Sequence, residues 1–411
     1  MKYLIIIFLF FIYACSSIKP EGNNIAVHYN VNENTPIVQY SVFHKYDSLS
    51  VLYFYVDASR LQYVKPIYKN NFLAKFSIKI QLFKTNDSKE ILDSLTLIKS
   101  DTLHYQQGGF IFDSLFFKAV YPGSYILKVK FTDVNRKTDV ETTIRVNKKN
   151  YSNKQNFLVK NAEGLPLGKT IFSNNDSIQI IVRNSSSKYL FVQYIKNKFP
   201  CAVPPFVDFL SEPTVFIADS VFKIKVKNGR TDFFSLKKEG IYHYSVDTLK
   251  VDGPTLYRFY DDFPKVVSTD LMFNALRYIT SNKEYENIHF LRDKKNGVDE
   301  FWIGIAGNAD RALTLIKKYY TRVEEANIFF TSYQEGWKTD RGMIYIIYGP
   351  PNVISRSDPI EAWTYGEPGH PLSITFKFSK FRNLFTDEDY RLNRSSFYKT
   401  SWYNALEPWR R

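Results

Sequence analysis

Apolar and polar residues alternate along much of the chain, and this period of two is the feature that most constrains the fold. The clearest example is residues 75–82, where apolar side chains share one strand face and polar side chains share the other, and residues 125–131 repeat it. Successive side chains of a strand point to opposite faces, so this alternation predicts half-buried strands. Turn-forming residues separate the strands at 85–88, 107–109 and 121–124. Short alternating strands with frequent turns predict antiparallel β-sandwiches.

The alternating part divides into two regions, which we expect to be two immunoglobulin-like sandwiches. The first covers residues 25–147 and the second covers residues 157–250, with a polar linker at 148–156. The segment Gly240–Val246 resembles Gly123–Val129, because each places a glycine turn before an aromatic-led strand. This weak repeat fits two sandwiches of one kind, or a coincidence between two strands. Further strands are predicted at 51–56, 110–117, 177–183, 189–194 and 221–226.

Apolar residues change to helical spacing near residue 264. They predict one helix around residues 271–279 and a longer helix over residues 309–333, where steps of three and four form one apolar stripe. We expect Asn308 to cap this helix and Asp310 to lie in its first turn, where the helix dipole favours an acid. The stripe is expected to pack within its own domain rather than to form a coiled coil.

The apolar run Met343–Tyr348 follows a glycine-flanked polar turn and precedes Gly-Pro-Pro. Because it is apolar on both faces, we expect a central strand there, with neighbouring strands at 361–365 and 373–378. Residues 264–411 are therefore expected to form an α+β domain with helices first and a sheet after. The whole chain is expected to be multidomain and mainly β.

The N-terminus has the pattern of a secretory signal over residues 1–14. Lys2 precedes an apolar run that is too short to span a bilayer. The junction Ile-Tyr-Ala-Cys-Ser-Ser at 12–17 resembles the bacterial lipobox, although Tyr13 is bulkier than is usual there. The resemblance implies that Cys15 carries a diacylglyceryl thioether, with palmitate as an expected acyl group. The alternative is ordinary signal cleavage with a chance cysteine.

The expected anchor sets the expected location. Two acyl chains hold a protein on a membrane almost permanently, and residues 15–24 would form a polar tether. Ser16 and Ser17 provide no Asp-type signal for inner-membrane retention, which favours the outer membrane, with the leaflet undetermined. Cys201 is then the only other cysteine, so no intramolecular disulfide is expected. The net charge of +14 favours anionic partners over nucleic acid behind a signal peptide, unless it serves solubility alone.

The segment Gly336-Trp-Lys-Thr-Asp340 matches the signature of the GWxTD domain family of bacterial envelope proteins. The resemblance covers about 264–411 and implies an envelope setting and a helix-then-sheet domain, with no implied chemistry. The run at 303–308 departs from the family's Arg-Asp-Pro-Thr-Pro-Gly-like loop, so no role of that loop is carried over. Other matching segments are Phe301-Trp302, the Tyr-x-Arg-Val-x-x-Ala-Asn at 320–327, the strand and turn at 344–351, and the Glu-x-Trp-x-Tyr at 361–365.

The sequence contains no familiar catalytic or metal-binding motif, and we expect no metal and no cofactor. The strongest candidate site is the turn with Trp337, Thr339, Asp340 and Arg341, and Trp363 is a further candidate binding residue. In the functional interpretation Trp337 stacks on a ligand while Asp340 and Arg341 make polar contacts. In the structural interpretation Trp337 fills the helix–sheet junction, Asp340 accepts backbone N–H bonds in the turn and Arg341 pairs with an acid.

These features predict a lipid-anchored outer-membrane protein that acts as a non-catalytic binding or assembly subunit. Its expected partner is an envelope protein or an anionic envelope component. In this main interpretation the two sandwiches act as a spacer that holds the terminal domain away from the bilayer, and two in line, each about 35–40 Å along a ten-residue strand, would reach well into the adjoining compartment.

One alternative is an enzyme acting on envelope glycan or peptide, with Asp340 as base or stabiliser. It requires a carboxylate or histidine near Asp340 in a partly dry cleft, and a solid hydrophobic plug around Trp337 would exclude it. A second alternative is a purely structural role, in which an unpaired, uncharged edge strand on either sandwich recruits partner strands.

Overall fold

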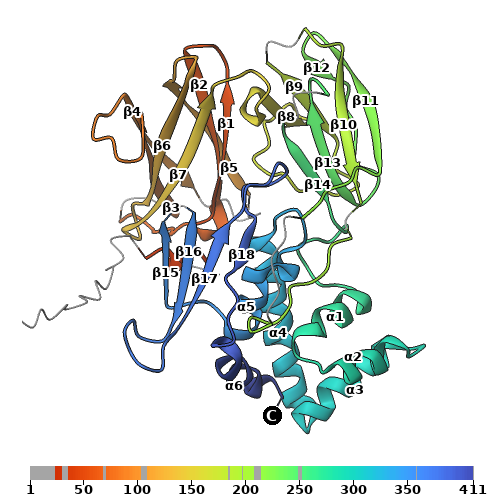
Figure 1. Ribbon diagram of the computed structural model, residues 1–411. Coiled ribbons are helices and arrows are strands. Elements are labelled where there is room, and N and C mark those ends of the chain that lie inside the picture. The colour runs from red at the N-terminus through yellow and green to blue at the C-terminus, as the bar shows by residue number, and fades with distance from the viewer. Residues whose placement is uncertain are drawn as a thin grey trace, which may run out of the picture.

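The computed structural model describes most of the chain after residue 23. Two β units lie side by side above a C-terminal unit, which holds the described α-helices and a small sheet (Figure 1). This mainly β architecture with an α+β C-terminal part confirms the expected fold class. The expected signal peptide, Cys15 and the tether up to residue 23 lie outside the described residues. The described residues are 24–29, 36–67, 71–102, 109–183, 186–196, 198–207, 214–248, 252–357 and 359–410.

The first β unit is a sandwich of a three-stranded sheet, in the order β1-β2-β5, and a four-stranded sheet, in the order β4-β3-β6-β7. The alternation expected at 75–82 is confirmed, because Phe76, Ile78 and Ile80 are buried between the sheets. The strands are β1 (Val38–His44), β2 (Leu49–Asp57), β3 (Leu73–Phe83), β4 (Asp93–Thr102), β5 (Phe110–Lys118), β6 (Gly123–Asp133) and β7 (Thr138–Lys148), with η2 (Ala58–Arg60) after β2.

The second β unit is a continuous ladder of seven strands in the order β14-β13-β10-β11-β12-β9-β8. Its two halves meet through β11 and β12 and bury one core between them. The short helix η3 (Lys154–Asn156) joins it to the first unit. The strands are β8 (Phe157–Asn161), β9 (Ile178–Val182), β10 (Tyr189–Ile195), β11 (Ser220–Lys227), β12 (Arg230–Thr231), β13 (Gly240–Ser245) and β14 (Thr255–Arg258).

The weak internal repeat places a tyrosine with the same kind of backbone hydrogen bond in each of the two β units. Two residues after Gly123, the Tyr125 hydroxyl donates to the carbonyl of Val120 at 2.7 Å. Two residues after Gly240, the Tyr242 hydroxyl donates to the carbonyl of Lys238 at 2.8 Å. A tyrosine that bonds back to the backbone just upstream is a recurring feature of immunoglobulin-like sandwiches.

Helices and a four-stranded sheet make up the C-terminal unit. The long predicted helix is confirmed as α4, which Asn308 caps by accepting from the N–H of Arg311 at 2.9 Å, with Asp310 in the first turn. The run at 303–308 is not a loop throughout, since α3 continues to Ala306 and ends at Gly307. The helices are α1 (Thr269–Ala275), η4 (Leu276–Tyr278), α2 (Asn282–His289), α3 (Lys294–Ala306), α4 (Ala309–Phe330), η5 (Gly336–Lys338), α5 (Asp340–Tyr348) and α6 (Tyr398–Arg410).

The strand predicted at Met343–Tyr348 is wrong, because these residues form α5. Thr339 caps this helix, and the residues from Met343 to Ile347 are all buried. A run that is buried on every side has no period, so a strand and a core helix look alike in the sequence. The neighbouring strands were predicted correctly as β16 and β17. The sheet consists of β15 (Val353–Ser357), β16 (Ile360–Tyr365), β17 (Ile374–Lys380) and β18 (Tyr390–Leu392).

Residues from 25 onward were expected to begin the first sandwich, but Asn24–Tyr29 lie on the C-terminal unit instead. The N–H of Ile25 donates to the carbonyl of Ile354 at 3.1 Å, and the Asn24 side chain accepts from the N–H of Ile354 at 2.9 Å. The Tyr29 ring, at the end of η1 (Ala26–Tyr29), packs on Trp363 with centroids 5.9 Å apart. The chain therefore covers the edge of β15 before it enters the first β unit.

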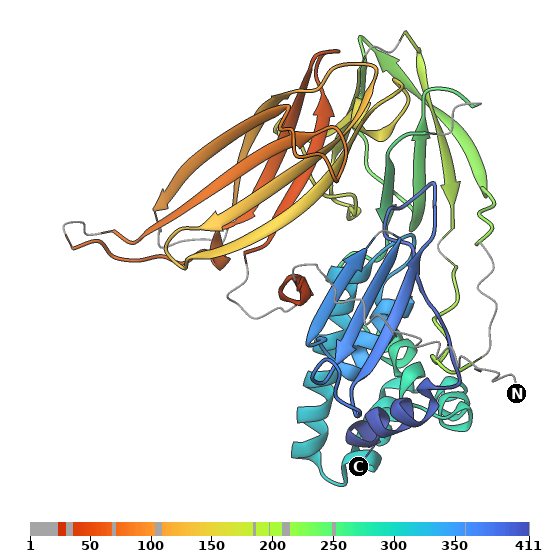
Figure 2. The ribbon, with the colours of Figure 1, turned by 60° about the vertical axis from the view of Figure 1, so that its left-hand side comes forward.

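The two β units do not lie in line, so the extended spacer considered from the sequence is wrong in its geometry. Arg183 of the second unit pairs with Asp47 of the first at 2.5 Å. The Tyr257 hydroxyl of the second unit donates to the carbonyl of Phe385 in the C-terminal unit. Both views show the two β units converging on the end of the C-terminal unit that carries its sheet (Figures 1 and 2).

Candidate functional site

The signature turn at Gly336–Asp340 connects α4 to α5 through η5 and is held by its own backbone. Trp337 is only 3% exposed, in the core formed by the helices and the sheet. Its N–H donates to the side-chain oxygen of Asn327 at 3.2 Å, and its carbonyl accepts from the Tyr278 hydroxyl at 2.8 Å. This burial agrees with the structural interpretation of Trp337 and leaves no ring face for a ligand.

Thr339 and two glycines fix the close approach of η5 to α5. The Thr339 hydroxyl donates to the carbonyl of Gly336 at 2.7 Å and accepts from the N–H of Gly342 at 3.0 Å. A Cβ atom on Gly342 would lie 1.9 Å from the carbonyl oxygen of Gly336, and one on Gly336 would lie 1.9 Å from that of Ala326. These positions require glycine for lack of space.

Asp340 binds the end of β18 rather than its own turn. Its carboxylate accepts from the N–H of Leu392 at 2.8 Å and from the Arg394 guanidinium at 2.5 Å. Both side chains of this ion pair are largely buried. Asp340 does accept a backbone N–H bond, as the structural interpretation expected, but from a strand 52 residues away. Its oxygens are occupied by these donors, an arrangement that suits a structural carboxylate better than a general base.

Arg341 and Trp363 meet at Glu361, a carboxylate that is fully buried. The Arg341 guanidinium, 1% exposed, lies 2.8 Å from the Glu388 carboxylate and 3.6 Å from that of Glu361. Glu361 accepts from Trp363 Nε1 at 2.8 Å and from Arg356 Nε at 2.7 Å. Burial acts to raise the pKa of Glu361, but the two guanidinium groups outweigh it and lower that pKa, so the carboxylate stays ionised.

The five candidate residues thus belong to one packed junction between helices and sheet. Arg341 pairs with acids, as the structural interpretation expected, and Trp363 has no exposed surface. Sequence reasoning missed Glu361 as the centre of the cluster, although it falls on the same strand face as Trp363. It also missed Arg394 and Tyr29, whose contacts with this region span more than 50 residues and leave no local pattern.

A comparison with protein families finds a match in the C-terminal part of the chain. Residues 240–411 match the family model of the GWxTD domain. The chain contains a GWxTD domain. The match starts at β13, earlier than the expected boundary at 264, and so includes two strands of the second β unit. No curated protein matches the chain.

The described residues also bear on metal binding and on membrane spanning. Among them, no group of three or more His, Cys, Asp or Glu side chains could hold a metal ion. No helix in the described part of the chain is long and apolar enough to cross a membrane. Cys201 is half-buried and packs against the core of the GWxTD domain, and burial raises the pKa of its thiol.

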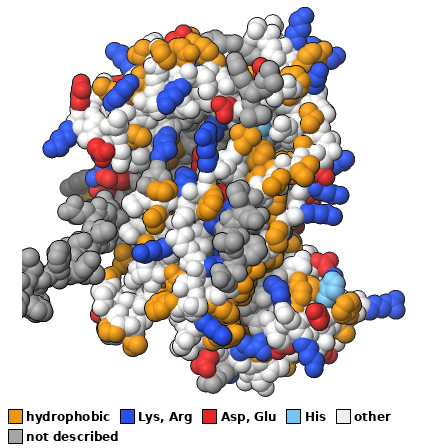
Figure 3. All heavy atoms as spheres, viewed as in Figure 1, with side chains coloured by type: hydrophobic (Ala, Val, Ile, Leu, Met, Phe, Trp, Pro, Cys, Tyr) orange, Lys and Arg blue, Asp and Glu red, His pale blue; other side chains and the backbone are white. Residues whose placement is uncertain are grey.

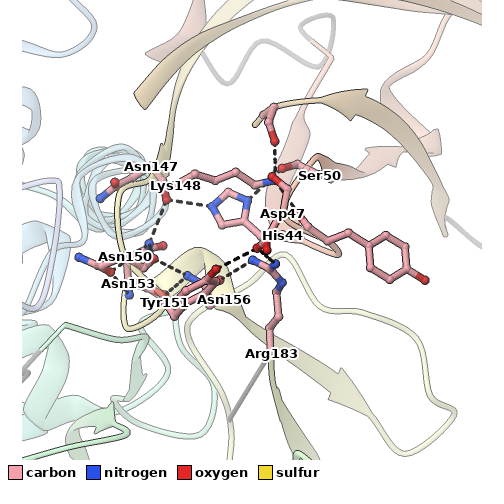
Figure 4. A network of polar contacts seen from close by, with 12 residues as sticks. His44, Asp47, Ser50, Asn147, Lys148, Asn150, Tyr151, Asn153, Asn156 and Arg183 are labelled. Carbon is pink, nitrogen blue, oxygen red and sulfur yellow. Dashed lines mark hydrogen bonds and ion pairs between the residues drawn. The ribbon is translucent and has the colours of Figure 1, made fainter. Parts of the chain in front are cut away.

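A second polar cluster lies where the two β units join (Figure 4). The Lys148 ammonium group, buried at the end of β7, donates to the carbonyls of Tyr46, Asp47 and Ala119 at 2.6–3.1 Å. Burial lowers the pKa of Lys148 to about 8. Arg183 enters from the second unit and binds Asp47. Lys148 thus has backbone oxygens in place of a carboxylate partner, and its bonds to Tyr46 and Asp47 fix the β1–β2 turn against the end of β7.

His44 makes this joint sensitive to acid. Its ring is fully buried, with Nδ1 3.0 Å from the Ser50 hydroxyl and Nε2 2.9 Å from the carbonyl of Asn147. Burial, with the nearby charges of Lys148 and Arg183, lowers its pKa from 6.5 to about 4. The folded state therefore favours neutral His44, and stability is lost as the pH falls from 6.5 towards 4.

We expect the wild-type protein to lose about 2 kcal/mol of stability between pH 7.5 and pH 5 through His44. A His44→Gln variant should lose about that much less over the same interval, because glutamine has no proton to gain. Urea unfolding at both pH values measures the difference. An identical pH dependence in the two proteins would contradict this prediction.

Proposed function

We propose that this protein is a lipid-anchored envelope protein that works as a non-catalytic binding or assembly subunit, with its GWxTD domain held next to the membrane. Acylation at Cys15 and an outer-membrane location remain part of this proposal. The observation that carries it is the contact of Asn24–Tyr29 with the GWxTD domain. The segment that would leave the lipid binds this domain first and the β units only afterwards.

The reach of the tether supports the membrane-proximal position. Asn24 follows Cys15 by nine residues, a stretch that spans roughly 30 Å when fully extended. Beyond Asn24, Tyr29 packs among the rings of Phe330 and Trp363, and its hydroxyl accepts from Arg356 at 2.7 Å. While this segment stays bound, the edge of β15 remains within that distance of the anchor.

The use of the signature residues supports a binding role over the enzyme alternative. Trp337 and Arg341 are buried, and Asp340 is bound by Arg394 and a backbone N–H. The acidic and aromatic side chains on which an active site would depend hold the domain together. A partner would therefore meet the outer surfaces of the molecule, where the excess of Lys and Arg favours anionic groups.

The anchor is tested first by fractionation. We expect Cys15→Ser to move the protein from the membrane fraction to the wash, because two acyl chains supply nearly all of the membrane affinity. Ser16→Ala is the matched control and should leave the protein in the membrane fraction. Retention of the Cys15→Ser protein in washed membranes would refute the anchor.

The membrane-proximal position is tested by energy transfer to acceptor lipids in vesicles. A donor dye on Leu372, which is exposed in the GWxTD domain, should transfer more strongly than one on Val221, which is exposed in the second β unit. Tyr29→Ala should reduce this difference, because loss of the ring contacts frees the segment and lengthens the tether. Equal transfer from both positions in the wild type would contradict the proposed orientation.

A further inference from the structure

We propose that the open edge of β11 binds an extended acidic segment of a partner protein, which joins the sheet as an added strand. Residues Ser220–Lys225 pair with β10 on one side, while β12 joins the other side only at Val226 and Lys227. Within the described ranges, no strand or isolated bridge pairs with that other side from Val221 to Lys225. Figure 1 shows β11 at the outer margin of the second β unit.

The backbone of β11 offers hydrogen-bonding groups to this edge. The N–H of Val226 donates to the carbonyl of Lys188 in the ladder with β10, at 2.8 Å. Hydrogen-bonded and non-bonded pairs alternate along an antiparallel ladder. The N–H and C=O groups of Val221, Lys223 and Lys225 are therefore directed to the open side. An extended segment of five or six residues can pair with them.

Three other strand edges are bonded by segments of the chain itself. The N–H of Leu167 donates to the carbonyl of Val159 in β8 at 2.8 Å. The N–H of Phe172 donates to the carbonyl of Tyr257 in β14 at 2.9 Å. The N–H of Ile25 donates to Ile354 of β15. Unpaired strand edges are templates for further pairing, and folds usually cover or disrupt them. The exposed half of β11 is not covered in this way by any described segment.

The side chains of β11 define the chemistry of the occupant. Lys223, Lys225 and Lys227 share the outward face with Val221, and Lys223 lies over the rings of Tyr189 and Phe191 in β10. None of the three lysines forms an ion pair with a described residue. Val221 is 59% exposed and Phe222, on the opposite face, is 42% exposed. Lys and Arg side chains follow the right-hand margin of the molecule, where β11 runs (Figure 3). An incoming strand therefore meets apolar contacts beside a row of positive charges.

The same charges decide between two occupants. Two copies of this edge would place lysines opposite lysines, and like charges across a strand pair are destabilising. A segment that alternates Asp or Glu with apolar residues would instead pair its acids with Lys223 and Lys225. Main-chain bonds supply affinity and alternate side chains supply specificity in this mode of binding. The charge pattern thus selects an acidic partner strand and opposes self-association.

Selection from a displayed library of random ten-residue peptides against the purified full chain tests the proposal. We expect enrichment of peptides that alternate acidic and apolar residues. The double variant Lys223→Glu/Lys225→Glu should weaken their binding at least tenfold. Val221→Pro should do the same, because it removes one edge-facing N–H while leaving all three lysines in place.

The matched control reverses two charges elsewhere. Lys75 and Lys79 lie on the outward face of β3, and Lys75→Glu/Lys79→Glu should leave peptide binding unchanged. Failure to enrich acidic peptides, or an equal loss in the control, would overturn the proposal. Full binding by a folded Val221→Pro protein would exclude strand addition.

The inference rests on the binding role proposed above and assigns that role to the edge of β11. Its failure leaves the anchor result unaffected, because that is read from fractionation.

Discussion

Replacing Glu361 by alanine is expected to lower the stability of the GWxTD domain by about 3–5 kcal/mol. The carboxylate is fully buried and faces two guanidinium groups, those of Arg341 and Arg356. Without it, Arg341 retains only the partly exposed Glu388 and Trp363 loses the acceptor of its ring N–H. A buried charge without its partner keeps its desolvation cost and loses the attraction that offset it.

Urea unfolding followed by tryptophan fluorescence measures this loss, since Trp337 and Trp363 both lie in the affected core. Lys294→Ala is the matched control, because its ion pair with Asp270 lies at the surface, where such pairs contribute less than about 1 kcal/mol. If Glu361→Ala unfolds within 1 kcal/mol of the control, the buried cluster is not what holds the junction together.

Gly342→Ala is expected to cost at least about 3 kcal/mol, near the upper end for added volume in a packed core. The new Cβ would lie 1.9 Å from the Gly336 carbonyl oxygen and 3.1 Å from the Trp337 Cα. Both contacts are with backbone, so no side chain can rotate to make room. The turn would have to move away from α5, and Trp337 would move with it.

Gly304→Ala is expected to change the stability of the same domain in the opposite direction. Gly304 lies within α3, and a Cβ there meets nothing within 4 Å. Alanine should stabilise the helix by about 0.5–1 kcal/mol, because it reduces the entropy of the unfolded chain. Unfolding midpoints of the two variants should shift in opposite directions. A Gly342→Ala protein as stable as Gly304→Ala would show that the close approach is unnecessary.

Elements with a one-sided pattern could be predicted from the sequence. The alternation around Ile78 marked a strand with one buried face, and the stripe on α4 marked an amphipathic helix with Asn308 as its cap. The run at Met343–Tyr348 was misassigned because it is buried on all sides and has no period. Thr339 and Asp340 carried the missing signal, since threonine is a favoured N-cap and an acid favours the first helical turn.

For the candidate residues, the sequence indicated their position at the helix–sheet junction but not most of the partners that they contact there. Trp337 and Arg341 do lie at the junction of helices and sheet, and Arg341 does pair with acids. The partners came from elsewhere in the chain, as Asp340 binds Arg394, 54 residues away. Such contacts follow from tertiary packing, so neither periodicity nor local motifs could predict them.

The docking of Asn24–Tyr29 decides where mechanical load would enter the molecule. A pull on a lipidated N-terminus would act on the contacts with β15 and on the Tyr29 ring, and the body of the GWxTD domain would bear it directly. Both β units would stay outside the path of this force. Only after the segment peels from β15 would tension reach β1 and the first sandwich. The docked segment would therefore carry the force first and keep it from the β-sheets until its contacts with β15 break.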